Sequence, residues 1–199
     1  ALGALTQGDD NTAIGYVAGA AITTESGVTL IGYGAGDAIS HTDANGTVCV
    51  GTNAGGAITS GIGNVAVGFQ ALDATATSDY NTAVGYQALS ALTLDGGTNC
   101  TAVGYQALDA DVNGQGSTAI GYHALHGQES SGTGEVVTGN TAVGYRAGRW
   151  NVTGTNNTWL GFGAGAGPSQ NSNSDNTGIG KSALAGITTG GNNVAVGAL

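Results

Sequence analysis

Positive charge, proline and cysteine are scarce in this 199-residue sequence. It holds three lysines and arginines against 13 acidic residues, a formal net charge of -10. Nucleic acids and anionic membranes attract proteins through clustered Lys and Arg, so we expect neither as a partner. One proline among 39 glycines, with no three-residue period, excludes a collagen helix. An apolar run of about 20 residues, the length that crosses a bilayer as a helix, is also missing.

Methionine is absent, and the N-terminus carries no basic-then-apolar signal segment. We therefore expect a processed mature protein or a piece of a longer one. The two cysteines, Cys49 and Cys100, lie at different phases of the repeat described next and three coils apart. At strand spacing they would be roughly 14 Å apart, beyond the ~7 Å reach of a disulfide. We expect two small, buried, unbridged side chains.

One stretch, NTAVGYQAL at residues 81–89, recurs with small changes along the whole chain. Its glycine, called the repeat glycine below, falls at Gly15, Gly32, Gly51, Gly68, Gly85, Gly104, Gly121, Gly144, Gly161, Gly180 and Gly197. Successive repeat glycines are 17 to 23 residues apart. A short period of this kind is typical of solenoids. We predict an all-β, parallel β-solenoid (β-roll) of about eleven 17–23-residue coils, forming a single domain over residues 1–199.

The residues before each repeat glycine predict a short strand with two unlike faces. The first and third positions before it are aliphatic or β-branched, as in Val84 and Thr82, and share a face because side chains alternate along a strand. The position between them is mostly alanine, as in Ala83, with Trp159 as an exception. Since β-branched residues suit strands, we expect their face to point inward. The smooth alanine face would then point outward, where rods could pack closely.

The residues after each repeat glycine predict a corner, a second inward column and a polar loop. Alanine stands three residues after the glycine from Ala18 to Ala183, and residues such as Ile22 and Leu92 mark an inward column seven residues after it. The remaining Thr, Ser, Gly, Asp and Asn are typical of turns and take all the length variation. Asparagine four residues before the glycine in seven coils predicts a ladder of side-chain amides that bond from coil to coil.

The two ends of the sequence fit one another. If Leu199 were joined to Ala1, the joint would make a seventeen-residue coil with alanine and leucine at their usual positions. Neither end has a visible cap, and uncapped solenoids expose strand edges. We expect either a segment of a longer array or copies stacked head to tail in a fibre. The candidate end-to-end contacts are Ala1, Leu2, Leu5, Val196, Ala198 and Leu199.

The repeats NTAVGYQAL, CTAVGYQAL, STAIGYHAL and NTAVGYRAG resemble the head repeats of trimeric autotransporter adhesins. Closely similar runs occur in bacteriophage tail-fibre proteins. The resemblance covers the whole chain and implies a left-handed roll, three chains side by side, and a role in adhesion or in a fibre shaft. It therefore suggests a location outside the cell, at the cell surface or on a virion.

An aromatic residue follows the repeat glycine in eight coils. These residues are Tyr16, Tyr33, Phe69, Tyr86, Tyr105, Tyr122, Tyr145 and Phe162. Outward rings could bind glycans, since flat rings pack on pyranose faces. The alternative is a stack at strand spacing that stiffens the rod and packs chains together. The sequence leaves open whether the rings face in or out.

Three further features concern chemistry. Regular threonines could order water as in ice-binding proteins, but they share the face that we expect to be inward. The acidic residues lie outside the strand motif and are typical of a solvated surface. His41, His123 and His126 lack the Glu, Cys or Ser partners of a metal site or a catalytic triad. We therefore expect no enzyme activity and no cofactor or metal.

These observations favour a structural protein that forms an extracellular fibre by head-to-tail stacking. Its main partner would be itself, as a polymer or a homotrimer. The alternative is a receptor- or glycan-binding adhesin head or tail-fibre shaft, with a cell-surface glycan as partner. Ice binding is a third hypothesis. We expect no nucleic acid partner and no membrane insertion.

Overall fold

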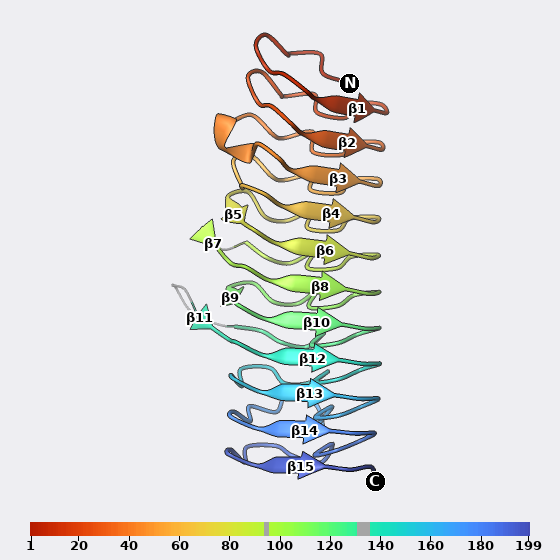
Figure 1. Cartoon of the computed structure of the whole chain (residues 1–199), viewed down its shortest axis with the longest axis vertical. Helices are drawn as coiled ribbons and strands as arrows, with labels where there is room; N and C mark the ends of the chain where they lie inside the picture. The colour runs from red at the N-terminus through yellow and green to blue at the C-terminus, as the bar shows by residue number, and fades with distance from the viewer. Residues whose placement is uncertain (94–95, 131–135) are drawn as a thin grey trace.

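The computed structural model describes residues 1–93, 96–130 and 136–199. The chain is a β-solenoid in which each coil adds one three-residue strand to a single eleven-stranded parallel sheet along the rod (Figure 1). The strands are β1 (Thr12–Ile14), β2 (Thr29–Ile31), β3 (Val48–Val50), β4 (Val65–Val67), β6 (Thr82–Val84), β8 (Thr101–Val103), β10 (Thr118–Ile120), β12 (Thr141–Val143), β13 (Thr158–Leu160), β14 (Thr177–Ile179) and β15 (Val194–Val196). The predicted fold class is confirmed. We number the coils 1 to 11 by their repeat glycines.

The strands pair in strict register. Thr82 lies beside Thr101, Ala83 beside Ala102 and Val84 beside Val103, and the same alignment holds along the sheet. Register is kept although coil length varies, because the extra residues all lie in the loops. The loop side holds two short parallel pairs, β5 (Ser78–Asp79) with β7 (Gly96–Gly97) and β9 (Gly114–Gln115) with β11 (Val136–Val137). It also holds a 3-10 helix, η1 (Thr42–Ala44). Among the described residues, no helix is long and apolar enough to cross a membrane.

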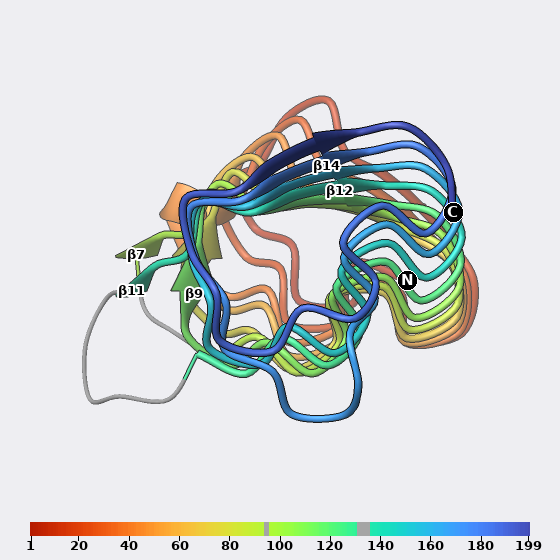
Figure 2. The ribbon, with the colours of Figure 1, turned by 90° about the horizontal axis from the view of Figure 1, so that it is seen from below.

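Viewed along the rod, the coils superpose closely, and the sheet forms one wall (Figure 2). The facing walls carry the alanine and leucine that follow each repeat glycine, such as Ala88 and Leu89, and the inward column of Ile22, Ile39, Ile58 and Leu92. All of these side chains are fully buried. The predicted second inward column is therefore confirmed, and it fills the interior opposite the sheet.

The strand faces are the reverse of those predicted. Ala83, like the other alanines of the central coils at this position, is fully buried, whereas Thr82 and Val84 beside it are only partly covered. At the first coil Ile14 is 60% exposed. The facing wall already fills a narrow interior, so only small side chains fit beneath most strands. The expectation that the β-branched face points inward, with a smooth alanine face outside, is wrong.

Trp159 shows how the interior accommodates an exception. Its side chain is fully buried in the alanine column. Glycines surround the ring, and a methyl group added at Gly165 or Gly178 would overlap it. The tryptophan therefore interrupts no outer surface. It occupies space that three small residues, Gly148, Gly165 and Gly178, leave free in the core.

The repeat glycine is required by its backbone and by its neighbour in the next coil. Gly104 has a φ of +135°, which L-residues rarely adopt. A Cβ atom there would lie 2.5 Å from the backbone oxygen of Gly121. Val103 before the glycine and Tyr105 after it both lie on the outside of the coil, as side chains two positions apart do along a strand.

The predicted asparagine ladder is confirmed. The backbone N–H and the side-chain amide of Asn157 both donate to Oδ1 of Asn140, at 2.9 and 3.1 Å. Asn176 repeats both bonds to Asn157. In coil 6 Cys100 replaces the asparagine, and its backbone N–H still donates to Oδ1 of Asn81 at 3.0 Å. The ladder therefore satisfies buried polar groups from coil to coil.

Both cysteines are free and buried, as expected from their spacing. Burial raises the pKa of the Cys49 thiol to about 12. Burial also raises the pKa of Cys100 to about 12. Both thiols therefore remain protonated at neutral pH and behave as small apolar residues.

Candidate functional site

The aromatic residues lie on the outside of the rod as two stacked runs. Tyr16 and Tyr33 form the first, with ring centroids 5.6 Å apart. The second run extends from Phe69 to Phe162, with successive centroids 4.9 to 5.3 Å apart and rings within 13° of parallel. Thr52 takes the ring position between the two runs. All eight rings are exposed to solvent, so the question of their direction is answered: they face outward.

The stacking limits what the aromatic runs can bind. Inside the second run each ring covers the faces of its neighbours, so mainly ring edges and tyrosine hydroxyls meet solvent. A pyranose that packs on an aromatic face needs that face to be free. The rings at the ends of the runs, such as Tyr33 and Phe69 beside Thr52, have one face without a stacked ring. Glycan binding along the whole ladder therefore lacks geometric support.

The outer face of the eleven-stranded sheet is flat, uncharged and weakly polar. It presents a threonine or valine column beside an aliphatic column, for example Thr101 beside Val103. The aromatic runs follow directly after the repeat glycine. The threonines were expected to point inward, and the structure corrects this: Thr158 is exposed, and those of the central coils are partly exposed. Methyl groups of Thr, Val and Ile cover much of this face, beside the threonine hydroxyls.

A polar column beside the rings changes its chemistry at coil 7. The side-chain amides of Gln87 and Gln106 donate in turn to Gln70 and Gln87, at 3.1 and 3.0 Å. His123 continues this column, with its Nε2 3.0 Å from Oε1 of Gln106. Its ring stacks on Tyr122 at 4.1 Å between centroids. The sequence patterns did not associate this histidine with a glutamine ladder.

The histidines of coil 7 form a small charged cluster with coils 6 and 8. His123 stacks on His126 at 4.4 Å between ring centroids, and Nδ1 of His126 pairs with the Asp109 carboxylate. Burial and the neighbouring charges of His126 and Arg149 lower the pKa of His123 to about 4. His41 lies elsewhere, paired with Asp43 at 3.0 Å. In the described part of the chain, no three His, Cys, Asp or Glu residues gather as metal ligands do.

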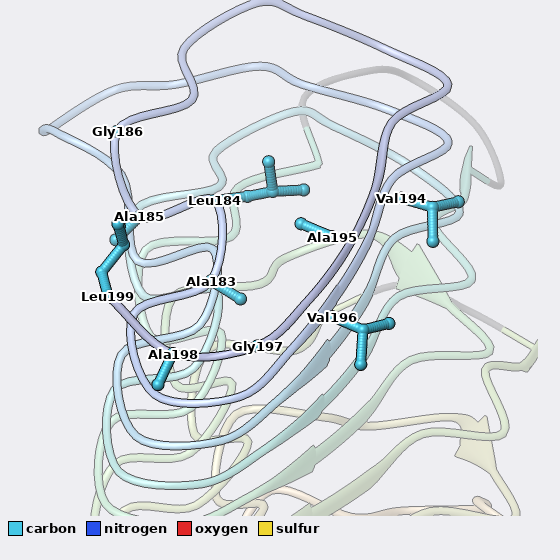
Figure 3. Close-up of a pocket in the computed structure, with 10 residues that line it drawn as sticks. All are labelled: Ala183, Leu184, Ala185, Gly186, Val194, Ala195, Val196, Gly197, Ala198 and Leu199. Carbon is cyan, nitrogen blue, oxygen red and sulfur yellow. The ribbon is translucent and has the colours of Figure 1, made fainter.

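The candidate end contacts lie at opposite ends of the rod (Figure 1). Leu2 and Leu5 pack against the first coil of the core, and Ala1 is exposed. At the other end Val196 and Leu199 are 74% and 88% exposed, and Ala198 is also exposed. Figure 3 shows these residues around a hollow of about 580 Å³. It is the open end of the solenoid core.

The sequence patterns did not single out Trp150 and its neighbours. Trp150 stands six residues after Gly144, where every other coil has alanine or glycine. That contrast within one column is the signal that could have identified it. It lines a hollow of about 300 Å³ between coils 6 and 9.

Comparison with protein families, with curated proteins and with solved structures finds no match to this chain.

Proposed function

We propose that this chain is a structural segment of an extracellular or virion fibre, in which further coils of the same cross-section continue the rod at its ends. The observation that carries the proposal is the strict register of the eleven parallel strands, which gives successive coils the same cross-section, so that a coil of a second copy can stack in the same way. The next coils come from a second copy of the chain, stacked head to tail. Such a rod bears load or spaces other parts, and the chain performs no catalysis.

The first residues of the chain carry apolar side chains that could cover the last coil of another copy. The segment before β1 already lies as a coil on coil 1: the backbone N–H of Leu2 donates to the oxygen of Ala18 at 3.2 Å, and that of Thr6 to Thr23 at 2.8 Å. Leu2 and Leu5 occupy the leucine and isoleucine columns of the core. In a second copy they would stand over Leu184 and Ile187, whose side chains are only partly buried here. Both apolar surfaces would thereby leave water.

The outer sheet face supports side-by-side packing of rods, which a homotrimer requires. Ten steps between strands give a face about 50 Å long and, over four residues, about 14 Å wide. The product, about 700 Å², is close to the ~800 Å² that each partner buries in a stable interface. A second copy also repeats at the same strand spacing, so contacts made at one coil recur at every coil.

Light scattering on the purified 199-residue chain tests the end-to-end proposal. We expect the mean mass to rise with concentration as copies add at the open ends. Leu184→Glu, which places a carboxylate in the end hollow, should hold the chain at a small, constant mass. Leu160→Glu is the matched control, because this exposed residue lies on the outer face of β13. If only Leu160→Glu reduces the mass, the rods associate laterally and the end-to-end proposal fails.

Ice binding is a second candidate, favoured by the outward direction of the threonine column. The column presents hydroxyl and methyl groups on a flat sheet in strict register. Ice crystals in the presence of the chain should then show thermal hysteresis and shaped growth, both lost with Thr118→Lys in the middle of the face. Normal ice growth with the unmodified chain would remove this candidate.

A further inference from the structure

Rare residue types of this chain gather in coils 7 to 9. Both arginines, two of the three histidines, the single proline and the partly exposed tryptophan lie between residues 121 and 168. The remaining coils are built almost entirely from small, aliphatic, amide and hydroxyl residues. A structural rod does not need this change in composition, so the position where these side chains meet is the strongest candidate for specific binding.

The residues meet at a hollow of about 300 Å³ on the side of the rod. Four coils build it. Ala110 comes from coil 6, His126 and Glu129 from coil 7, Trp150 from coil 8, and Ser169 and Gln170 from a loop of coil 9. In Figure 2 this loop, drawn in blue, stands out from the otherwise superposed coils.

Glycines and stacking contacts hold the tryptophan in place. Gly127 lies below it, and a Cβ atom there would be 3.0 Å from the indole ring. The Arg149 guanidinium lies 4.4 Å from the ring centroid, a cation–π contact. His126 meets the ring edge-on at 6.0 Å between centroids, and its Nδ1 pairs with Asp109. The ring and the imidazole are therefore oriented before any ligand arrives, which lowers the entropic cost of binding.

The wall combines one large aromatic ring with hydroxyl, amide and carboxylate groups. Ser169, Gln170 and Glu129 are exposed, so their polar atoms are free to exchange water for ligand hydroxyls. Small-molecule pockets span about 300 to 1,000 Å³, and this one lies at the lower limit. The size suits one ring-sized group, and the mixed wall suits a ring with one apolar face and several hydroxyls.

We propose that this hollow binds a pyranose residue of a glycan. The Arg149 guanidinium covers one face of Trp150, so the sugar packs its C–H groups against the opposite face, while Glu129 accepts from its hydroxyls and Gln170 and Ser169 donate or accept. The site differs from the aromatic ladder, in which stacked rings cover each other's faces. It goes beyond the structural role, because a rod can form without it.

Glycan-array screening of the purified chain followed by isothermal titration with the best binder tests the proposal. Tryptophan fluorescence gives a second readout, because Trp159 is fully buried and only Trp150 can contact a ligand. We expect Trp150→Ala to weaken binding at least tenfold, Glu129→Gln to weaken it several-fold, and Trp150→Phe to retain most of it. Tyr80→Ala, an exposed ring remote from the hollow, should leave the affinity unchanged.

The array separates neutral from acidic sugars. If acidic sugars bind best, Arg149, whose guanidinium lies over the Trp150 ring, supplies the charge, and Arg149→Gln should remove that preference but not the binding of neutral pyranoses. Two results would overturn the proposal. One is the absence of binding by every pyranose tested at about 10 mM, where even weak sites are occupied. The other is a glycan affinity that survives Trp150→Ala and is lost with Tyr105→Ala, which would assign binding to the ladder.

Discussion

Coils 4 to 6 and coils 7 to 9 add equivalent strands to the same sheet and continue the same aromatic run, yet they differ in other columns outside the sheet. In coils 4 to 6 the glutamine and alanine columns repeat without change, and the ring column holds Phe69 and then two tyrosines. In coils 7 to 9 the glutamine column becomes His123, Arg146 and Gly163, and a column of small residues admits Trp150. The sheet stays in register throughout. A few residues around the repeat glycine are therefore enough to build the rod, and the other columns are free to vary.

The largest effect should come from substitution of a repeat glycine in coils 4 to 6. Gly104→Ala places a Cβ atom 2.5 Å from the backbone of Gly121 at a φ of +135°. We expect a loss of about 3 kcal/mol or more in the free energy of unfolding, measured by denaturant titration with circular dichroism.

Gly116→Ala is the control for this glycine. Gly116 also has a positive φ, but nothing lies within 4 Å of its added Cβ atom. Its substitution should cost only about 1 kcal/mol. Equal losses in both variants would show that the close approach of coils adds no cost at the repeat glycine.

Removal of an asparagine from the ladder should cost more stability in coil 9 than in the last coil, although both losses should be smaller than that at the repeat glycine. Asn157→Ala removes the acceptor of two bonds from Asn176 and the donor to Asn140 in a fully buried position. We expect a loss of about 2 to 3 kcal/mol, since buried partners are left unsatisfied. Asn193→Ala, at the last coil and exposed, should cost less than about 1 kcal/mol in the same titration.

Acid should destabilise the chain through His123, which replaces the glutamine of coils 4 to 6. Its pKa falls from 6.5 to about 4 in the folded chain, so the unfolded chain binds the proton more readily. The stabilisation by the neutral ring is therefore complete above pH 6.5 and is lost as the pH falls toward 4.

His123→Gln extends the glutamine column of coils 4 to 6 and removes this titration. Between pH 7 and pH 4.5 the unmodified chain should lose about 2 kcal/mol more than the variant. Urea titrations of both chains at the two pH values measure the difference. An equal loss in both would show that the ring keeps its ordinary pKa.

The smallest expected effect is a gain. Thr52→Tyr would fill the gap between the two aromatic runs and join Tyr33 to Phe69 through a new ring. Stacked aromatic pairs contribute about 0.5 to 1.5 kcal/mol, so we expect a stabilisation of about 1 kcal/mol in thermal and denaturant unfolding. Thr52→Val, which keeps the β-branched shape without a ring, should change stability little. No gain over valine would mean that neighbouring rings contribute no stacking energy at this surface.

The period of the sequence was sufficient to predict the fold. The repeat glycines located every strand of the large sheet, and the polar composition located the loops that absorb changes in coil length. The asparagine ladder also followed from position alone, because in-register stacking places identical side chains beside one another.

The same pattern could not determine which strand face is inside. Alternation shows that Thr82 and Val84 share one face and that Ala83 has the other, but it does not show which face points inward. That depends on how much space the facing wall leaves, and that wall comes from Ala88, Leu89 and Leu92. A narrow interior favours alanine over valine, so the usual association of β-branched residues with a core misled the prediction.

The Trp150 hollow was missed for a different reason. It forms where a loop of coil 9 passes beside a side chain of coil 8 and another of coil 7. The contact joins residues of different coils, and each of these residues departs from the repeat at a different position. Column-by-column comparison would have identified Trp150 as unusual, but only the folded chain brings it together with Glu129 and Gln170.

Electron microscopy of the purified chain tests the central claim, that this solenoid is a fibre segment continued end to end, most directly. We predict unbranched filaments one rod wide and far longer than the ~50 Å of a single chain at strand spacing. Discrete particles of single-chain length at every concentration would contradict the claim.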